Sequence, residues 1–137
     1  MTDYAADAIR HVTSASLTKP LNIYSHATVH NGIAYVSCIQ GLIPGTLGFP
    51  SSVSDEARQA FDNLRVVVEE CGSKLSRVLK MTILMTDISE FGQINAVVDE
   101  YFPRNPPARA SIAVAELPKG ARVVVEVIAA VCPPADR

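Results

Sequence analysis

The segment Val123–Val131, with the sequence VVVEVIAAV, decides the fold of this chain. Glu126 is its only polar residue, so the segment is apolar on both of the faces that a β-strand presents. A strand of this kind is normally covered on both sides of its sheet. We therefore predict a strand over residues 122–131, and we expect protein to pack against each face of its sheet.

Strand and helix patterns alternate in the residues before this segment. Apolar positions three and four apart predict a helix over residues 55–71, and Asp87-Ile88-Ser89-Glu90 resembles a capping box that opens a second helix ending at Phe102. Asn31-Gly32 predicts a type I′ hairpin turn, and residues 38–52, rich in Gly and Pro, predict a loop. Further strands are predicted over residues 9–12, 25–30, 33–37, 78–86 and 108–116.

This order of elements predicts a two-layer α+β domain over residues 1–137. Two strand–helix–strand units imply right-handed parallel crossovers, which place both helices on one face of a six-stranded mixed sheet. Two helices can cover only that face. Another copy of the chain is the simplest candidate for covering the second face.

Composition narrows the class of protein. The net charge of −2 argues against a nucleic-acid partner, and no apolar run approaches the ~18 residues of a membrane helix. The three cysteines, Cys38, Cys71 and Cys132, are widely spaced and form no CxxC pair, which favours a reducing cytoplasm over a disulfide framework or a zinc site. The mean hydropathy of +0.20 is high for a soluble chain and favours an oligomer.

Arg109 is unusual because it stands at the start of what the pattern predicts to be a buried strand. Alternation places Ser111, Ala113 and Ala115 on its face of the strand, and all three are small. The space beside them would suit a guanidinium that binds a carboxylate through two hydrogen bonds. The alternative is a structural ion pair with an acid across the sheet.

Asn95 and the histidines are the other polar candidates. Asn95 lies four residues after Phe91 and three before Val98, inside the apolar stripe of the second helix. A buried amide needs partners, so the residues alone favour an Asn95 that fastens a nearby loop backbone, where it would still shape a cleft. His26 and His30 lie on a strand without a third ligand, and we expect no metal there.

Three segments, Pro107–Ser111, Leu117-Pro118 and Val125–Ala129, resemble the signature of the RidA family (YjgF/YER057c/UK114). Tyr24-Ser25 before the hairpin also resembles a family segment, and the resemblance extends over nearly the whole chain. It implies a chorismate-mutase-like fold that assembles as a homotrimer with the open sheet faces turned inward. It also implies that the last strand lies between two others.

Enzymatic members of this family hydrolyse reactive 2-imino and 2-enamino acids to 2-keto acids and ammonia, in clefts between subunits. The resemblance implies no cofactor and no metal. By resemblance, Arg109 holds the substrate carboxylate, Tyr24 lines the cleft from the neighbouring subunit, and Asn95 orients groups around the site. Ser37 and Cys38 border the substrate through backbone groups.

The chain departs from the RidA pattern at several site positions. Ser111 replaces a cysteine two residues after the arginine, and Cys38 replaces the usual glycine. Val124 stands where RidA has the glutamate proposed to activate water, whereas Glu126 lies two residues further on the same strand face. We predict that Glu126 carries any general-base role. These changes indicate a subgroup with a different substrate or weaker chemistry.

Three functions remain open from the sequence. The first is a deaminase for small carboxylated imines and enamines, and the second is a pathway deaminase for an aminomuconate-like ring-cleavage product. The third is a non-catalytic trimer that binds a small molecule or a protein. An endoribonuclease activity, ascribed to some relatives, is disfavoured by the acidic charge balance.

Overall fold

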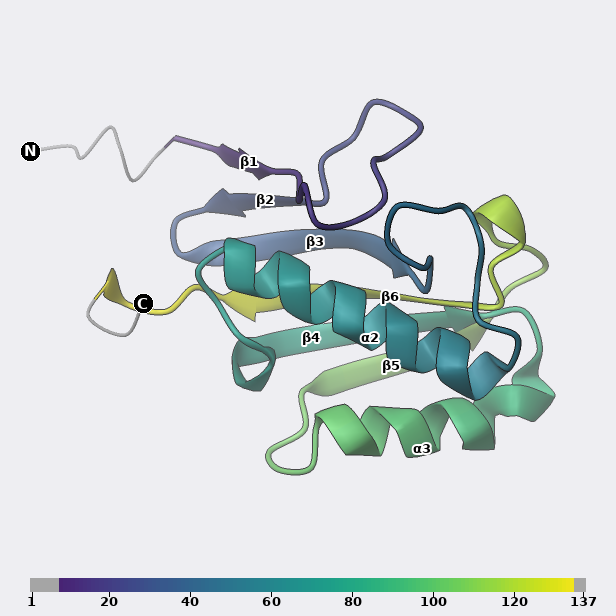
Figure 1. Cartoon of the computed structure of the whole chain (residues 1–137). Coiled ribbons are helices and arrows are strands. Elements are labelled where there is room, and N and C mark those ends of the chain that lie inside the picture. Colours follow the sequence, from purple (N-terminus) through teal and green to yellow (C-terminus); the bar gives the residue numbers. More distant parts are fainter. Residues whose placement is uncertain (1–7, 135–137) are drawn as a thin grey trace, which may run out of the picture.

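The computed structural model describes residues 8–134 and consists of a six-stranded mixed sheet with two α-helices on one face (Figure 1). No helix in this part of the chain is long and apolar enough to cross a membrane. The helices are α2 Val53–Glu70 and α3 Phe91–Tyr101. The strands are β1 Arg10–Val12, β2 Ala27–His30, β3 Ile33–Gln40, β4 Val78–Met85, β5 Ala108–Ala113 and β6 Val123–Ala130.

The strands lie in the order β1-β2-β3-β6-β4-β5. β6 runs antiparallel to both of its neighbours, β3 and β4, and this confirms the expected insertion of the last strand. β3 and β4 therefore run in the same direction, and β5 is parallel to β4. Both crossover connections are helical, and α2 and α3 cover the same face of the sheet, as the order of elements predicted (Figure 1).

Local signals explain the hairpin and the start of α2. Asn31 and Gly32 have φ values of 49° and 78°, as a type I′ turn requires. α2 begins two residues before the predicted start at Asp55, because the Ser52 side chain accepts a hydrogen bond from the Asp55 amide at 3.1 Å and acts as the N-cap.

The second helix also begins at a different residue from the one predicted. Asp87 accepts a hydrogen bond from the Ser89 amide at 2.9 Å, so it is a cap as expected. The turn that it caps is a 3₁₀ turn over Ile88–Glu90, and α3 begins only at Phe91.

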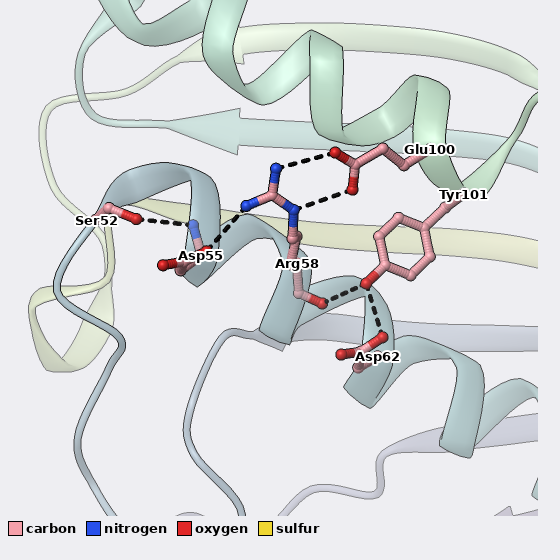
Figure 2. Close-up of polar contacts among 6 residues, drawn as sticks. All are labelled: Ser52, Asp55, Arg58, Asp62, Glu100 and Tyr101. Atoms are coloured by element: carbon pink, nitrogen blue, oxygen red, sulfur yellow. Dashed lines mark hydrogen bonds and ion pairs between the residues drawn. The ribbon is translucent and has the colours of Figure 1, made fainter.

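Arg58 joins the two helices (Figure 2). Its guanidinium donates to both carboxylate oxygens of Glu100 on α3, at 3.0 and 2.9 Å, and to Asp55 on α2 at 2.9 Å. Beside it, the Tyr101 hydroxyl donates to the Asp62 carboxylate at 2.7 Å. These contacts connect the exposed surfaces of α2 and α3, and α3 carries part of the candidate site.

Two strands differ from their predicted extents. β3 continues to Gln40, where a loop was predicted from Cys38, because its pairing with β6 resumes beyond a bulge between Val36 and Ile39. β5 ends at Ala113 and is the edge of the sheet, paired only with β4. The predicted burial of this strand is therefore wrong for the single chain, and Arg109 is exposed.

The helices cover one face of the sheet and leave the other face exposed to solvent in the single chain. The hydrophobic core lies between the helices and one face, and on β6 it takes in Val123, Val125, Val127 and Ala129. We call the opposite side the open face. Its large apolar residues Tyr35, Ile112 and Ile128 are 49%, 48% and 36% exposed. The open face includes Tyr35, Cys38, Gln40, Lys80, Thr82, Leu84, Ala108, Ala110, Ile112, Glu126 and Ile128, together with Val124, which is buried.

Candidate active site

Arg109 and Asn95 form one half of the candidate site. Arg109 pairs in register with the core residue Met81, so its side chain leaves β5 on the helix side of the sheet. There the Arg109 Nη2 donates to Asn95 Oδ1 on α3 at 2.7 Å. The guanidinium has further donors on an exposed edge, so it is held in place while it stays accessible to an anion.

Asn95 and Ser111 are less buried than the sequence pattern suggested. Asn95 is partly exposed on the flank of the buried stripe of α3, so the expectation of a buried amide is wrong. Its carbonyl oxygen accepts the hydrogen bond from Arg109, and no bond from Asn95 to a loop backbone is seen among the described residues. Ser111 lies on the same face of β5 as Arg109, in register with Ile83, and is half-buried.

Tyr24, Ser37 and Cys38 lie in the other half of the candidate site, a hollow of about 460 Å³. Arg109 and Asn95 are not among the described residues that line this hollow. The single chain therefore brings the predicted residues together in two groups and does not join the groups. The hollow is lined by Asn22, Tyr24, Ser37, Cys38, Gln40, Leu84, Leu117, Pro118, Lys119 and Val124.

A β-bulge in β3 turns Cys38 toward the hollow. Ser37 and Cys38 together oppose the single residue Glu126 of β6, because pairing shifts between Val36 and Ile39. Ser37 anchors the bulge, since its hydroxyl donates to the Ser25 carbonyl at 2.7 Å. This bond also ties β3 to the segment that carries Tyr24.

Cys38 and Glu126 contact each other on the open face. The thiol donates to Glu126 Oε2 at 3.4 Å. Desolvation, followed by the charge of Glu126 and this hydrogen bond, raises the pKa of Cys38 to about 11. The thiol is therefore protonated at neutral pH and is not poised as a nucleophile. Glu126 itself is exposed and lines a neighbouring hollow of about 320 Å³ together with Tyr35, Lys80 and Thr82.

Gln40 and Lys119 close one end of the 460 Å³ hollow. Gln40 Nε2 donates to the Pro118 carbonyl at 2.8 Å, and Lys119 Nζ donates to Gln40 Oε1 at 3.2 Å. Lys119 has a φ of 63°, so the turn that carries it is tightly bent. The sequence analysis did not identify these two residues or Leu84, because their proximity depends on strand pairing.

Glu56 and Arg122 support this turn from inside the protein. The buried Glu56 carboxylate accepts hydrogen bonds from Arg122 Nε and from the Arg122 amide, each at 2.7 Å. A buried carboxylate is costly unless it is paired in this way. Gly41 packs against the turn of α2 that carries Glu56, where an added Cβ would clash with the Glu56 carbonyl oxygen. The pair therefore fixes the start of β6 against α2.

The histidines and acids of the described chain do not gather into a metal site. Within residues 8–134, no group of three His, Cys, Asp or Glu residues is placed to hold a metal ion. His26 is buried, and its Nδ1 accepts a hydrogen bond from the Ser14 amide at 2.9 Å. Desolvation lowers the pKa of His26 below its usual 6.5.

Comparisons with known proteins extend over most of the chain. Residues 14–131 match the family described as endoribonuclease L-PSP. The 2-iminobutanoate/2-iminopropanoate deaminase of Rattus norvegicus is 39% identical, over 88% of this chain and 90% of the rat protein. The solved structure of YEO7 from yeast is 34% identical with a TM-score of 0.89, covering 91% of this chain and all of that one. RidA from the Antarctic bacterium Psychrobacter is 30% identical with a TM-score of 0.85, covering 89% and 99% of the two chains.

Proposed function

The chain belongs to the endoribonuclease L-PSP family, to which the RidA proteins also belong, and from this membership we propose that it hydrolyses small 2-imino and 2-enamino acids. Water adds to the imine carbon, the carbon–nitrogen bond breaks, and a 2-keto acid and ammonia are released. The observation that carries the proposal is the 39% identity to a protein named as a deaminase of two short-chain 2-imino acids. A cytoplasmic location, favoured by the cysteine usage, belongs to the same proposal.

Arg109 is proposed to bind the carboxylate that every such substrate carries. The support is its exposed guanidinium, which Asn95 holds by a 2.7 Å hydrogen bond and which has donors left for a ligand. A bidentate pair with a carboxylate would use these donors. Ser111, beside it on β5, is small enough to leave room for the bound group.

We propose that the active site is completed between copies of the chain in a homotrimer. Arg109, Asn95 and Ser111 from one copy would face Tyr24, Ser37 and Cys38 from the next. Two observations support this arrangement. The two groups of residues are separate within one chain, and the open face exposes large apolar side chains that a second copy would cover.

Glu126 is proposed to accept a proton from the attacking water. The support is its exposed carboxylate on the open face, in contact with Cys38 at the edge of the hollow. A positioned general base contributes ~10²–10⁴-fold to such a step. The protonated Cys38 thiol would then hold the carboxylate in one orientation through its hydrogen bond.

One observation favours a second candidate, a non-catalytic binding trimer. Among the described residues that line the 460 Å³ hollow there is no carboxylate. A trimer of this kind would retain Arg109 for binding a carboxylate without hydrolysing an imine. The family description also names an endoribonuclease, but the net charge of −2 gives little support to RNA binding.

The test is to generate 2-imino acids in place with an amino-acid oxidase and to follow their loss against trapping by semicarbazide. The proposed deaminase shortens the lifetime of the imine and releases the 2-keto acid in step. A protein that leaves every imine tested at the uncatalysed rate, yet still binds 2-keto acids, would be the non-catalytic trimer instead.

A further inference from the structure

The 460 Å³ hollow has an apolar wall that arises from strand register. Leu84 on β4 pairs with Val124 on β6, and Val124 pairs with Gln40 on β3, so the three residues form one row across the open face. Ile112 on β5 pairs with Leu84 and extends the row to the sheet edge. At the end of the sheet where the hollow lies, this row contains no charged side chain.

The turn after β5 adds a second apolar wall. Leu117 and Pro118 line the hollow together with the ring of Tyr24. Lys119 is the only charged side chain among the described lining residues, and its ammonium donates to Gln40 at the rim. Gln40 in turn donates to the Pro118 carbonyl, so both polar atoms of its side-chain amide are hydrogen-bonded. The space between the walls is therefore suited to a hydrocarbon group.

We propose that this hollow binds the side chain of the substrate, and that the protein prefers 2-imino acids with branched or aromatic side chains to those with a methyl group. This inference rests on the proposed function for the substrate's carboxylate and imine groups. Leu84 and Leu117, which are partly exposed and line the hollow, are the specificity-determining residues. In the proposed trimer, substrate binding places the carboxylate on Arg109 of one copy and the side chain between Leu84 and Leu117 of the next.

The size of the effect follows from apolar burial. One additional methylene group in an apolar pocket changes kcat/KM by ~10-fold or more in favourable cases. Burial of one CH₂ strengthens binding by ~4-fold on average. A leucine-derived imine has three more carbons than an alanine-derived one. Partial burial of these carbons gives an expected preference of ~10-fold or more in kcat/KM.

The experiment measures kcat/KM for alanine-derived and leucine-derived imines in wild type, in Leu117→Asn and in Leu79→Asn. Leu117→Asn makes one wall polar at a surface turn, where folding is least affected. Leu79→Asn is the matched control, because Leu79 is half exposed at the opposite end of β4 from Leu84. We expect Leu117→Asn to lower the leucine-to-alanine ratio at least ~5-fold and Leu79→Asn to leave it unchanged. Thermal unfolding checks that both variants fold.

A binding measurement separates this inference from the proposed function. Calorimetry with pyruvate and with 4-methyl-2-oxopentanoate tests the hollow without any catalysis. Tighter binding of the longer keto acid, lost in Leu117→Asn, supports the hollow even if no imine is hydrolysed, in which case the proposed function alone fails. Hydrolysis of imines with no preference for longer side chains overturns the inference and leaves the proposed function intact. If no imine is hydrolysed and the longer keto acid binds no more tightly than pyruvate, both proposals are overturned.

Discussion

Arg109 on the edge strand β5 is tied to Asn95 on α3 by a 2.7 Å hydrogen bond from its Nη2 to the amide oxygen. α3 is the helix of the crossover that connects the parallel strands β4 and β5, so the strand and the helix together set the direction of the guanidinium. Because one N–H group of the Arg109 guanidinium is bonded to Asn95, the positions of its other N–H groups are restricted before a ligand binds. Such preorganisation lowers the entropic cost of binding an anion.

Replacement of Arg109 is expected to weaken carboxylate binding. Arg109→Ala should lower the affinity for 2-keto acids ~10-fold or more, because a charge-assisted bidentate pair is lost. Arg109→Lys should restore little, since an ammonium lacks the planar fork. Titration calorimetry on the folded variants gives the comparison. Equal affinity in wild type and Arg109→Ala would remove Arg109 from the site.

Asn95→Ala is expected to act through Arg109. Its effect on keto-acid affinity should be smaller than that of Arg109→Ala, and the double variant should bind no more weakly than Arg109→Ala alone. Non-additivity of this kind indicates that two residues act as one unit. Strictly additive losses in the calorimetric cycle would show instead that Asn95 acts independently of the arginine.

Glu126→Gln is expected to lower kcat for imine hydrolysis at least ~100-fold, because the general base is lost while the side-chain size is kept. Glu69→Gln on the exposed surface of α2 is the matched control and should retain wild-type activity. The semicarbazide-trapping assay measures both. Full activity of Glu126→Gln would exclude the base role.

The same variant has a second readout in the Cys38 thiol. Glu126 contributes to the rise of the Cys38 pKa to about 11, through its charge and its hydrogen bond. In Glu126→Gln, the pKa of Cys38 should therefore fall, although desolvation keeps it above the ordinary value. The pH dependence of alkylation of this thiol measures the change. An unaltered profile would show that the two side chains do not interact in solution.

Sedimentation of the purified protein is expected to give a trimer, three times the 14.7 kDa chain mass. Ile128→Lys on the open face should produce monomers, because the charge would be buried in an apolar interface. Ile88→Lys, an equally drastic change at an exposed 3₁₀ turn, should leave the trimer intact. A wild-type monomer at micromolar concentration would contradict the proposed assembly.

His26 is expected to make the protein less stable in mild acid. Burial lowers the folded pKa of His26 below 6.5, so the unfolded chain binds more protons once the pH falls below that value. The contribution of His26 to the free energy of unfolding is therefore complete above pH 6.5, and it is lost as the pH falls toward the pKa of His26 in the folded state. Urea unfolding at pH 7.5 and 5.5 measures the change. The free energy of unfolding should fall between these pH values in wild type and in His11→Gln, and it should fall less in His26→Gln.

Glu56→Ala is expected to destabilise the fold by ~3–5 kcal/mol, because Arg122 and two backbone amides lose a buried acceptor. Glu90→Ala, at the partly exposed Glu90, should cost much less. Urea unfolding measures both free energies. A loss below ~1 kcal/mol for Glu56→Ala would show that water replaces the carboxylate, and would contradict its structural role.

The sequence by itself determined the order of elements, the hairpin turn and the presence of the apolar last strand. These features depend on neighbours in the chain, as Asn31-Gly32 and the apolar run Val123–Val131 do. The extents of β3, α2 and β5 were less well predicted, because strand pairing and capping bonds set where an element stops. Arg109 was identified as a candidate because a charged residue among small ones breaks the local pattern.

Only the tertiary structure decided which residues meet. Cys38 and Glu126 are 88 residues apart in the chain, and they meet because the pairing of β3 with β6 shifts register at a bulge. The row from Leu84 through Val124 to Gln40 likewise exists only once β6 lies between β3 and β4. Periodicity gives the face of a strand on which a side chain lies, but not which strand lies beside it. Pairing is set by packing of the whole core, so the contacts of the candidate site could not be read from local patterns.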